Sequence, residues 1–172
     1  MGMLALTHNA CAAPVVYPIT PADTIIGFRA FALSVVPIGG FFSAFQGTLT
    51  LDQATPGACQ VVVSIRTASL HLPNPAIVAD VERRGFLDPQ DFPAMIYHGH
   101  CAGGQIEGVL TLRGISRPLA MKISSKGSLF VATAAIDRFN WDVDARPVLA
   151  GRTIDISIQT RLQAIETPPP VR

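Results

Sequence analysis

The sequence predicts an all-β protein of about eight antiparallel strands with one short helical insertion. Most of the 172 residues alternate between apolar and polar side chains with the period of two that is typical of strands. Turn-forming residues separate the alternating runs at 55–57, 103–104 and 126–127. Only one segment, near residue 75, has helical features instead. These three observations together indicate a single β-domain.

Each alternating run has one apolar face. The runs cover residues 24–30, 45–51, 59–67, 95–101, 106–112, 119–123, 130–136 and 154–162. The last is the clearest, because Ile154, Ile156 and Ile158 alternate with polar side chains. Antiparallel sheets often have one dry and one wet face. Strands of this kind close into a barrel or stack as a sandwich, and the alternation alone does not decide between them.

The helical segment begins with Asn74, a preferred N-cap residue, followed by Pro75, which suits the first helical turn. Ile77 and Val81 belong to an apolar stripe, whereas Asp80 is expected to face water. A short amphipathic helix inside a β-chain is expected to cover one end of a barrel. The pattern leaves open whether it is a lid or a stopper.

The composition limits the function classes. Hydrophobic residues make up 49% and charged residues 15%, with a mean hydropathy of +0.38 and a net charge of +1. The balanced charge gives little support to nucleic-acid binding. No apolar run approaches the roughly 18 residues of a spanning helix, so we expect no stable membrane insertion. The apolar residues must therefore enclose either one another or a ligand.

The two ends differ from the rest of the chain. Residues 1–16 are interpreted as a signal-peptide remnant or a disordered N-terminus, because small residues around Cys11 are typical of a signal-peptidase site. Residues 17–165 form the predicted domain, and 166–172 form a proline-rich tail. This interpretation predicts that the protein is exported.

Several motifs in a fixed order resemble the YceI-like, polyisoprenoid-binding family. They are GGFFSAFQGTLTLD, FLDPQDFP, GVLTLRGISRP and AIDRFNW, within a similarity that extends from about residue 17 to 162. The resemblance implies an extended eight-stranded antiparallel β-barrel of lipocalin-like shape. It also implies periplasmic secretion, frequent dimers, and a long apolar tunnel for an isoprenoid or another long-chain amphiphile. A quinone tail, a polyprenyl phosphate and a fatty-acyl chain are the candidate ligands.

Strand alternation proposes the residues of the tunnel wall. They are Phe28, Phe42, Phe45, Val63, Met95, Tyr97, Leu110, Leu112, Phe130 and Ile156, with Phe41 near the rim. Burying each CH₂ group of a ligand contributes about 0.8 kcal/mol, so such a wall needs no catalytic group. The alternative is a filled core in a protein that serves as a non-catalytic interaction or stress-response module without a ligand.

Two arginines are candidates for a ligand head group. Arg138 shares the inward parity of its strand, so it is expected to meet either a phosphate or carbonyl head group or a structural carboxylate such as Asp142 or Asp144. Arg117 is a weaker candidate. The chain also departs from the family pattern at Ala32, where a polar residue is common, and at Asp142, where glycine is common. The head-group preference is therefore expected to differ here.

The cysteines and histidines suggest two further sites. If the strands at 59–67 and 95–101 pair with Ile65 opposite Met95, Cys59 lies beside Cys101, and an oxidising periplasm favours a disulfide. His98 and His100 share an outward face, but no third metal ligand is evident. We therefore expect no metal site. No GxSxG or HExxH motif occurs, and we expect neither a catalytic residue nor a cofactor other than a bound lipid.

Overall fold

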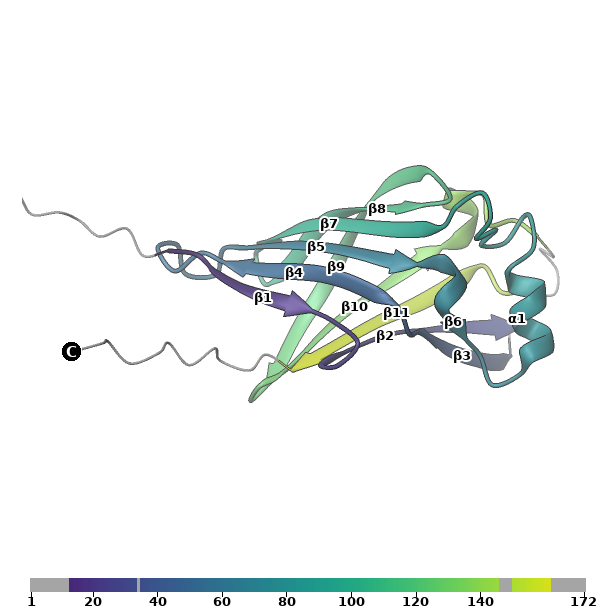
Figure 1. Ribbon diagram of the computed structural model, residues 1–172, viewed down its shortest axis with the longest axis horizontal. Helices are drawn as coiled ribbons and strands as arrows, with labels where there is room; N and C mark the ends of the chain where they lie inside the picture. Colours follow the sequence, from purple (N-terminus) through teal and green to yellow (C-terminus); the bar gives the residue numbers. More distant parts are fainter. Residues whose placement is uncertain (1–12, 34, 146–149, 162–172) are drawn as a thin grey trace, which may run out of the picture.

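Figure 1 shows the computed structural model, an antiparallel β-sheet that curls around a single interior, with one helix at one end. The structure describes residues 13–33, 35–145 and 150–161. The strands are β1 (Val15–Ile19), β2 (Thr24–Ala32), β3 (Val36–Phe42), β4 (Phe45–Leu51), β5 (Cys59–Arg66), β6 (Leu70–His71), β7 (Ala94–Ala102), β8 (Gln105–Leu112), β9 (Ile115–Lys126), β10 (Leu129–Asp137) and β11 (Thr153–Arg161). The helices are α1 (Pro75–Val81) and the 3₁₀ turns η1 (Thr67–Ser69) and η2 (Arg138–Trp141).

The all-β prediction is confirmed, but the described sheet has eleven strands instead of eight, in the order β1-β4-β5-β7-β8-β9-β10-β11-β2-β3-β6. The difference arises at three bends that alternation does not reveal. Only Ser43 and Ala44 separate β3 from β4, η1 separates β5 from β6, and a turn at residues 20–23 separates β1 from β2. Counted as bent strands, these three pairs and the other five give eight passes of the chain.

The bends also explain how the sheet curls. Strand β3 pairs with β2, while its continuation β4 pairs with β5, so the two sides of the strand order come together. Strands β5 and β7 pair with Ile65 opposite Met95, which is the register that the sequence predicted. Glycines at 103 and 104, both with positive φ, make the tight turn between β7 and β8.

Helix α1 forms where its sequence signals lie. The side chain of Asn74 accepts a hydrogen bond from the backbone N–H of Ala76 at 2.9 Å, as expected of an N-cap, and Pro75 occupies the first turn. The helix ends at Val81 and lies across one end of the curled sheet (Figure 1). None of the helices among the described residues is long and apolar enough to cross a membrane.

The inward faces of the strands form one hydrophobic core cluster. It extends from Cys59, at the end of the sheet away from α1, to Ile136 and Val143 at the α1 end. The predicted signal-peptide remnant, apart from residues 13–16, and the proline-rich tail lie outside the described residues.

Candidate ligand-binding cavity

The α1 end of the interior is hollow. A cavity of about 360 Å³ lies between α1 and the inward faces of β2, β3, β5, β7, β8, β9, β10 and β11. This volume falls within the ~300–1,000 Å³ that is usual for small-molecule sites. The lining is almost wholly aliphatic and aromatic, and Asp80 and Arg138 are its charged residues. The inward faces therefore do not fill the interior with their own side chains.

Seven of the ten residues that alternation proposed for the wall line this cavity. They are Phe28, Phe42, Met95, Tyr97, Leu110, Leu112 and Ile156. The rings of Phe28 and Phe42, on the paired strands β2 and β3, lie 5.9 Å apart between centroids. Phe41, the neighbour of Phe42, points to the opposite face of β3 and is exposed. In the GGFF segment, the strand alternation thus directs Phe42 into the cavity and Phe41 to the surface.

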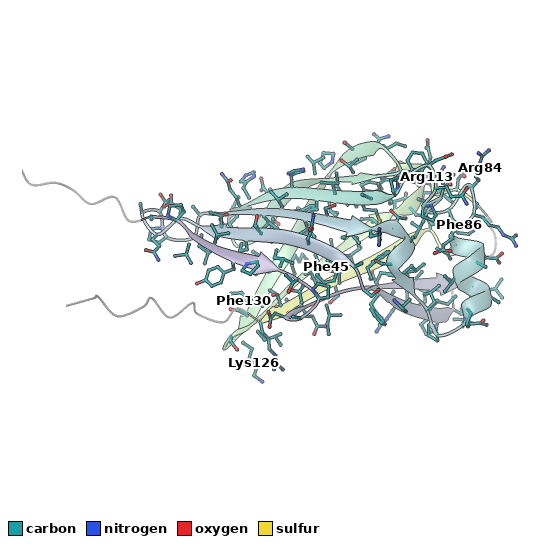
Figure 2. The ribbon with its side chains drawn as sticks, in the orientation of Figure 1. Phe45, Arg84, Phe86, Arg113, Lys126 and Phe130 are labelled. Carbon is teal, nitrogen blue, oxygen red and sulfur yellow. A yellow bond between two sulfur atoms is a disulfide. The ribbon has the colours of Figure 1, made fainter. Side chains whose placement is uncertain are left out.

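Three proposed wall residues lie elsewhere. Phe45 and Val63 are buried in the core but are not among the residues that line the cavity. Phe130 is only partly buried and lies near Lys126, at the end of β10 away from α1 (Figure 2). Alternation assigned the face of each strand, but it does not tell which inward side chains border the hollow: Phe45 and Val63 pair with Ile65 and Tyr97, which do line the cavity.

Other lining residues were not proposed. Ile154 and Ile158 flank Ile156 on the inward face of β11, and the same alternation could have found them. Phe86, Leu87 and Val143 come from the segments after α1 and η2, which have no strand periodicity. No pattern in the sequence signals their contribution.

Helix α1 covers the cavity with one side. Ile77 and Val81 line it, as expected for the apolar stripe. Asp80 also lines it, so the expectation that this side chain faces only water was wrong. The reason is its place one residue before Val81, at the edge of the apolar stripe. Its carboxylate lies 3.3 Å from the guanidinium of Arg83.

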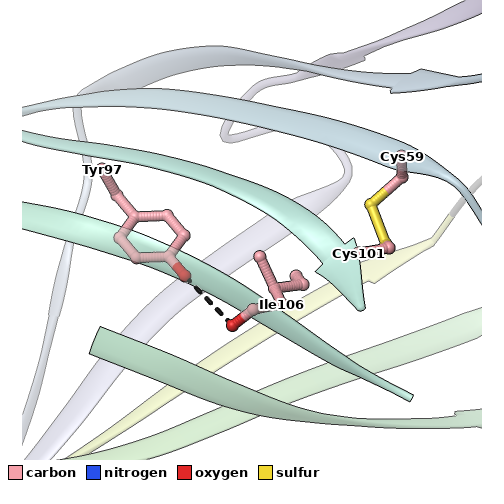
Figure 3. The surroundings of a disulfide bond; sticks show 4 residues. All are labelled: Cys59, Tyr97, Cys101 and Ile106. Atoms are coloured by element: carbon pink, nitrogen blue, oxygen red, sulfur yellow. Dashed lines mark hydrogen bonds between the residues drawn. A yellow bond between two sulfur atoms is a disulfide. The ribbon is translucent and has the colours of Figure 1, made fainter. Parts of the chain in front are cut away.

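Tyr97 marks the boundary between the cavity and the packed interior near the disulfide. Its hydroxyl donates to the carbonyl of Leu119 at 3.0 Å and also lies 3.4 Å from that of Ile106 (Figure 3). Its ring lies where a Cβ at Gly99 or Gly108 would stand, 2.9 Å and 2.5 Å from the nearest ring carbons. These two glycines therefore make room for the ring. Burial raises the pKa of the Tyr97 hydroxyl to about 12.

Arg138 is buried at the α1 end, and only 2% of its surface is exposed. Its Nε donates to the carbonyl of Gly151 at 2.8 Å, and Nη2 donates to that of Ala150 at 2.9 Å. Nη1 donates to the carbonyls of Ala145, at 3.1 Å, and Val143. The guanidinium thus joins the segment after η2 to the start of β11. The predicted inward direction is right. Backbone carbonyls hold this cation, and the charge of Asp144, one of the two carboxylates expected as partners, also acts on it.

The electrostatics of Arg138 follow from this burial. Desolvation lowers the pKa of its guanidinium, and the charges of Asp144 and Asp137 partly offset this effect. The ring of Phe139 lies 4.6 Å from the guanidinium carbon, and the ring of Phe86 lies 5.8 Å from it. Because four carbonyls already occupy most of its five N–H groups, Arg138 mainly shapes the cavity wall.

Arg117, the other head-group candidate, is not among the residues that line the cavity. Arg117 is exposed, and its Nε donates to the carbonyl of Asn140 at 3.1 Å. Asp142 ends η2 with φ +53°, in the left-handed region that glycine adopts most easily. A backbone requirement thus accounts for the glycine that is common there in the family. Ala32, the other departure, does line the cavity.

Cys59 and Cys101 form a disulfide, with their Cα atoms 4.9 Å apart (Figure 3). The bridge joins β5 to β7 at the end away from α1, beyond Tyr97. His98 and His100 lie on the exposed outer face of β7. Among the residues that the structure describes, no group of three or more His, Cys, Asp or Glu side chains is placed to hold a metal ion.

A curled antiparallel sheet around one apolar cavity defines a lipocalin-like β-barrel protein. Within this class the chain belongs to the YceI-like family, because the profile of the YceI-like domain matches residues 17–162.

Other proteins are similar to this chain in sequence or in fold. A UPF0312 protein of Pseudomonas savastanoi pv. phaseolicola is 26% identical over 108 residues, which cover 59% of this chain and 56% of that protein. The chain thus spans only about half the length of this curated relative. BcnA of Burkholderia cenocepacia superposes with a TM-score of 0.71 at 18% identity, over 84% of this chain and 99% of BcnA. A polyisoprenoid binding domain from Saccharophagus degradans superposes with a TM-score of 0.58 at 12% identity, over 86% of this chain and 98% of that domain.

Proposed function

We propose that this protein binds the long apolar chain of an isoprenoid or a similar amphiphile in its interior and carries or stores it, without catalysing a reaction. The hollow α1 end is the observation that carries this proposal. A filled core, the alternative, would leave no space behind Phe28 and Phe42. The similar fold of the polyisoprenoid binding domain from Saccharophagus degradans supports a ligand of this kind.

The lining determines how such a ligand would be held. Burying each CH₂ group contributes about 0.8 kcal/mol, so the affinity comes from the length of chain inside the wall. Arg138 already donates to four carbonyls, and the side chain of Asp80 is anionic. The tail, more than the head group, is therefore the recognised part. The disulfide supports an oxidising location, and we propose the periplasm.

The proposal can be tested by a substitution that fills the cavity with a large side chain. Ala30 lines the cavity on β2, and the Ala30→Trp substitution would place an indole where the chain is proposed to lie. The matched control is Val62→Trp, on the exposed outer face of β5. We expect native mass spectrometry of the gently purified protein to show a bound lipid. Titration with a fluorescent long-chain alcohol should give at least about tenfold weaker binding to Ala30→Trp and unchanged binding to Val62→Trp. Equal binding by both variants would refute the cavity as the site.

A further inference from the structure

The turn between β2 and β3 has an unusual composition for a surface loop. Residues 30–42 read AFALSVVPIGGFF, with no charged residue and with serine as the only polar side chain. Surface turns usually contain Gly, Pro, Asn, Asp or Ser, because these residues suit the backbone and contact water. Here the residues that flank the turn are aliphatic.

These side chains are in contact with solvent. Leu33, Val35 and Val36, here called the hairpin tip, are 58%, 74% and 51% exposed. Leu33 also has φ +50°, a left-handed conformation that is uncommon for a leucine. Single exposed apolar residues need no explanation, but three of them together at one turn form a small projecting apolar surface.

The hairpin tip directly follows residues that line the cavity. Phe31 and Ala32, which immediately precede it, line the cavity. Ala32 forms a β-bridge with Ala150, and the N–H of Gly151 donates to the carbonyl of Phe31 at 2.6 Å. Figure 1 shows β2 ending beside α1, which covers the cavity. The apolar surface therefore continues from the projecting tip into the interior.

Several exposed charges around this end are paired. Three exposed arginines each lie within ion-pair distance of a carboxylate: Arg83 of Asp80 at 3.3 Å, Arg84 of Asp91 at 3.8 Å, and Arg152 of Asp137 at 2.6 Å. Pairing of this kind reduces the attraction for an acidic partner. The contact that this end favours is thus apolar.

We propose that the hairpin tip inserts into the surface of a lipid bilayer and holds the cavity entrance against it. Amphiphiles with long apolar chains dissolve in bilayers, and an entrance in contact with the acyl region would let a chain pass without crossing water. A second copy of this chain fits the tip less well. Three side chains cannot supply the ~800 Å² per partner that a stable interface buries. The docking is peripheral and reversible.

The first experiment places a reporter in the hairpin tip. The Val35→Trp variant is mixed with vesicles of phosphatidylcholine that carries brominated acyl chains, which quench a tryptophan in contact with them. Trp141 is buried in the core and provides an unquenched background. We expect quenching and a blue shift for Val35→Trp, unchanged by added salt, and neither for Val62→Trp on the outer face of β5. A folded Val35→Trp protein that is not quenched would overturn the proposal.

The second experiment removes apolar surface without adding a reporter. Leu33→Asn, which suits the left-handed conformation, is combined with Val35→Ser, and flotation with phosphatidylcholine vesicles is measured. We expect at least about tenfold weaker vesicle binding. The matched control combines Val62→Ser with Val109→Ser, two residues that are each 40% exposed on β5 and β8, and it should bind as the unchanged protein does.

Two other outcomes would also overturn the proposal. One is binding only to vesicles that contain phosphatidylglycerol, lost on addition of salt, because it would indicate an electrostatic contact. The other is a dimer in sedimentation that the tip substitutions abolish, together with no vesicle binding. Membrane docking goes beyond the proposed function, and the two proposals can be refuted independently. Binding of a long-chain alcohol in the absence of vesicles tests the cavity alone, whereas quenching tests the hairpin tip alone.

Discussion

The two ends of the curled sheet have the same alternating sequence pattern, but the inward side chains pack together at one end and surround a cavity at the other. Towards the disulfide end, inward residues such as Cys59 and Val61 of β5 are buried in the core and do not line the cavity. At the α1 end, the inward residues of β2, β8 and β11 surround about 360 Å³ of space. Tyr97 lies between the two regions, with its hydroxyl bonded to the backbone.

The difference shows what makes a β-barrel hollow. At the disulfide end, covalent closure and interdigitated side chains hold the strands together. At the α1 end, those roles belong to the backbone carbonyls around Arg138 and to the helix across the opening. Because these contacts support the wall without filling the interior, its inner surface can remain free for a ligand. The comparison therefore predicts that stability depends mainly on one end of the interior and ligand affinity on the other.

The largest expected effect concerns the buried cation. Arg138→Met would leave the carbonyls of residues 143, 145, 150 and 151 without their donor, at a cost of about 3–5 kcal/mol in the free energy of unfolding. Chemical denaturation measures this loss. Arg152→Met is the control, because its ion pair with Asp137 is exposed and contributes about 1 kcal/mol or less. Equal losses in the two variants would mean that Arg138 does not support the cavity wall.

Removing the disulfide should separate stability from affinity. Because the bridge closes a sequence separation of 42, Cys59→Ser combined with Cys101→Ser is expected to lower the free energy of unfolding by about 2–4 kcal/mol. The affinity for a long-chain alcohol should stay within about twofold below the melting temperature, since the bridge lies beyond Tyr97. A large loss of affinity in the folded variant would show that the two ends are not independent.

A matched pair of smaller substitutions compares the stability that packed and cavity-lining residues contribute. Val63 and Val143 are 2% and 3% exposed, but only Val143 lines the cavity. Val63→Ala should cost about 2 kcal/mol in the free energy of unfolding, because it creates a new void in packed surroundings. Val143→Ala should cost about half as much, because one side of this residue already lacks packing partners. Equal losses, measured by thermal or urea denaturation, would contradict a hollow α1 end.

The smallest effect concerns the boundary residue. Tyr97→Phe removes a buried hydroxyl and should cost about 1 kcal/mol at neutral pH. Folding raises the pKa of this hydroxyl from 10.0 to about 12, so the folded state favours the neutral phenol. That stabilisation is complete below pH 10.0 and is lost as the pH rises towards about 12. The difference in unfolding free energy between the unchanged protein and Tyr97→Phe should therefore shrink over this range. A constant difference would place the phenol in water.

Much of the fold could be predicted from the sequence, and seven of the ten proposed wall residues do line the cavity, although most of the lining was not proposed. Alternation has a reliable physical basis in the pleat, which is why Met95, Leu110 and Ile156 were assigned to the correct face. The pattern carries no information on which inward side chains border the hollow, and Phe45 was therefore proposed for a wall to which its strand partner Ile65 contributes but it does not.

The remainder depends on tertiary structure. The carbonyls that hold Arg138 come from segments without strand periodicity, so alternation predicted its inward direction and not its partners. The bends that divide eight passes into eleven strands also have no signature in the alternation. The existence of a hollow came from the family resemblance, since periodicity alone was equally compatible with a filled core.

A crystal structure of the full chain grown with farnesol, a long isoprenoid alcohol, would test the central claim most directly. The account predicts continuous elongated density that lies against Phe28, Phe42 and Ile156 and ends near Tyr97, with the interior near the disulfide unchanged. An interior in which the lining side chains have closed on one another, with farnesol absent or bound only outside the sheet, would contradict it.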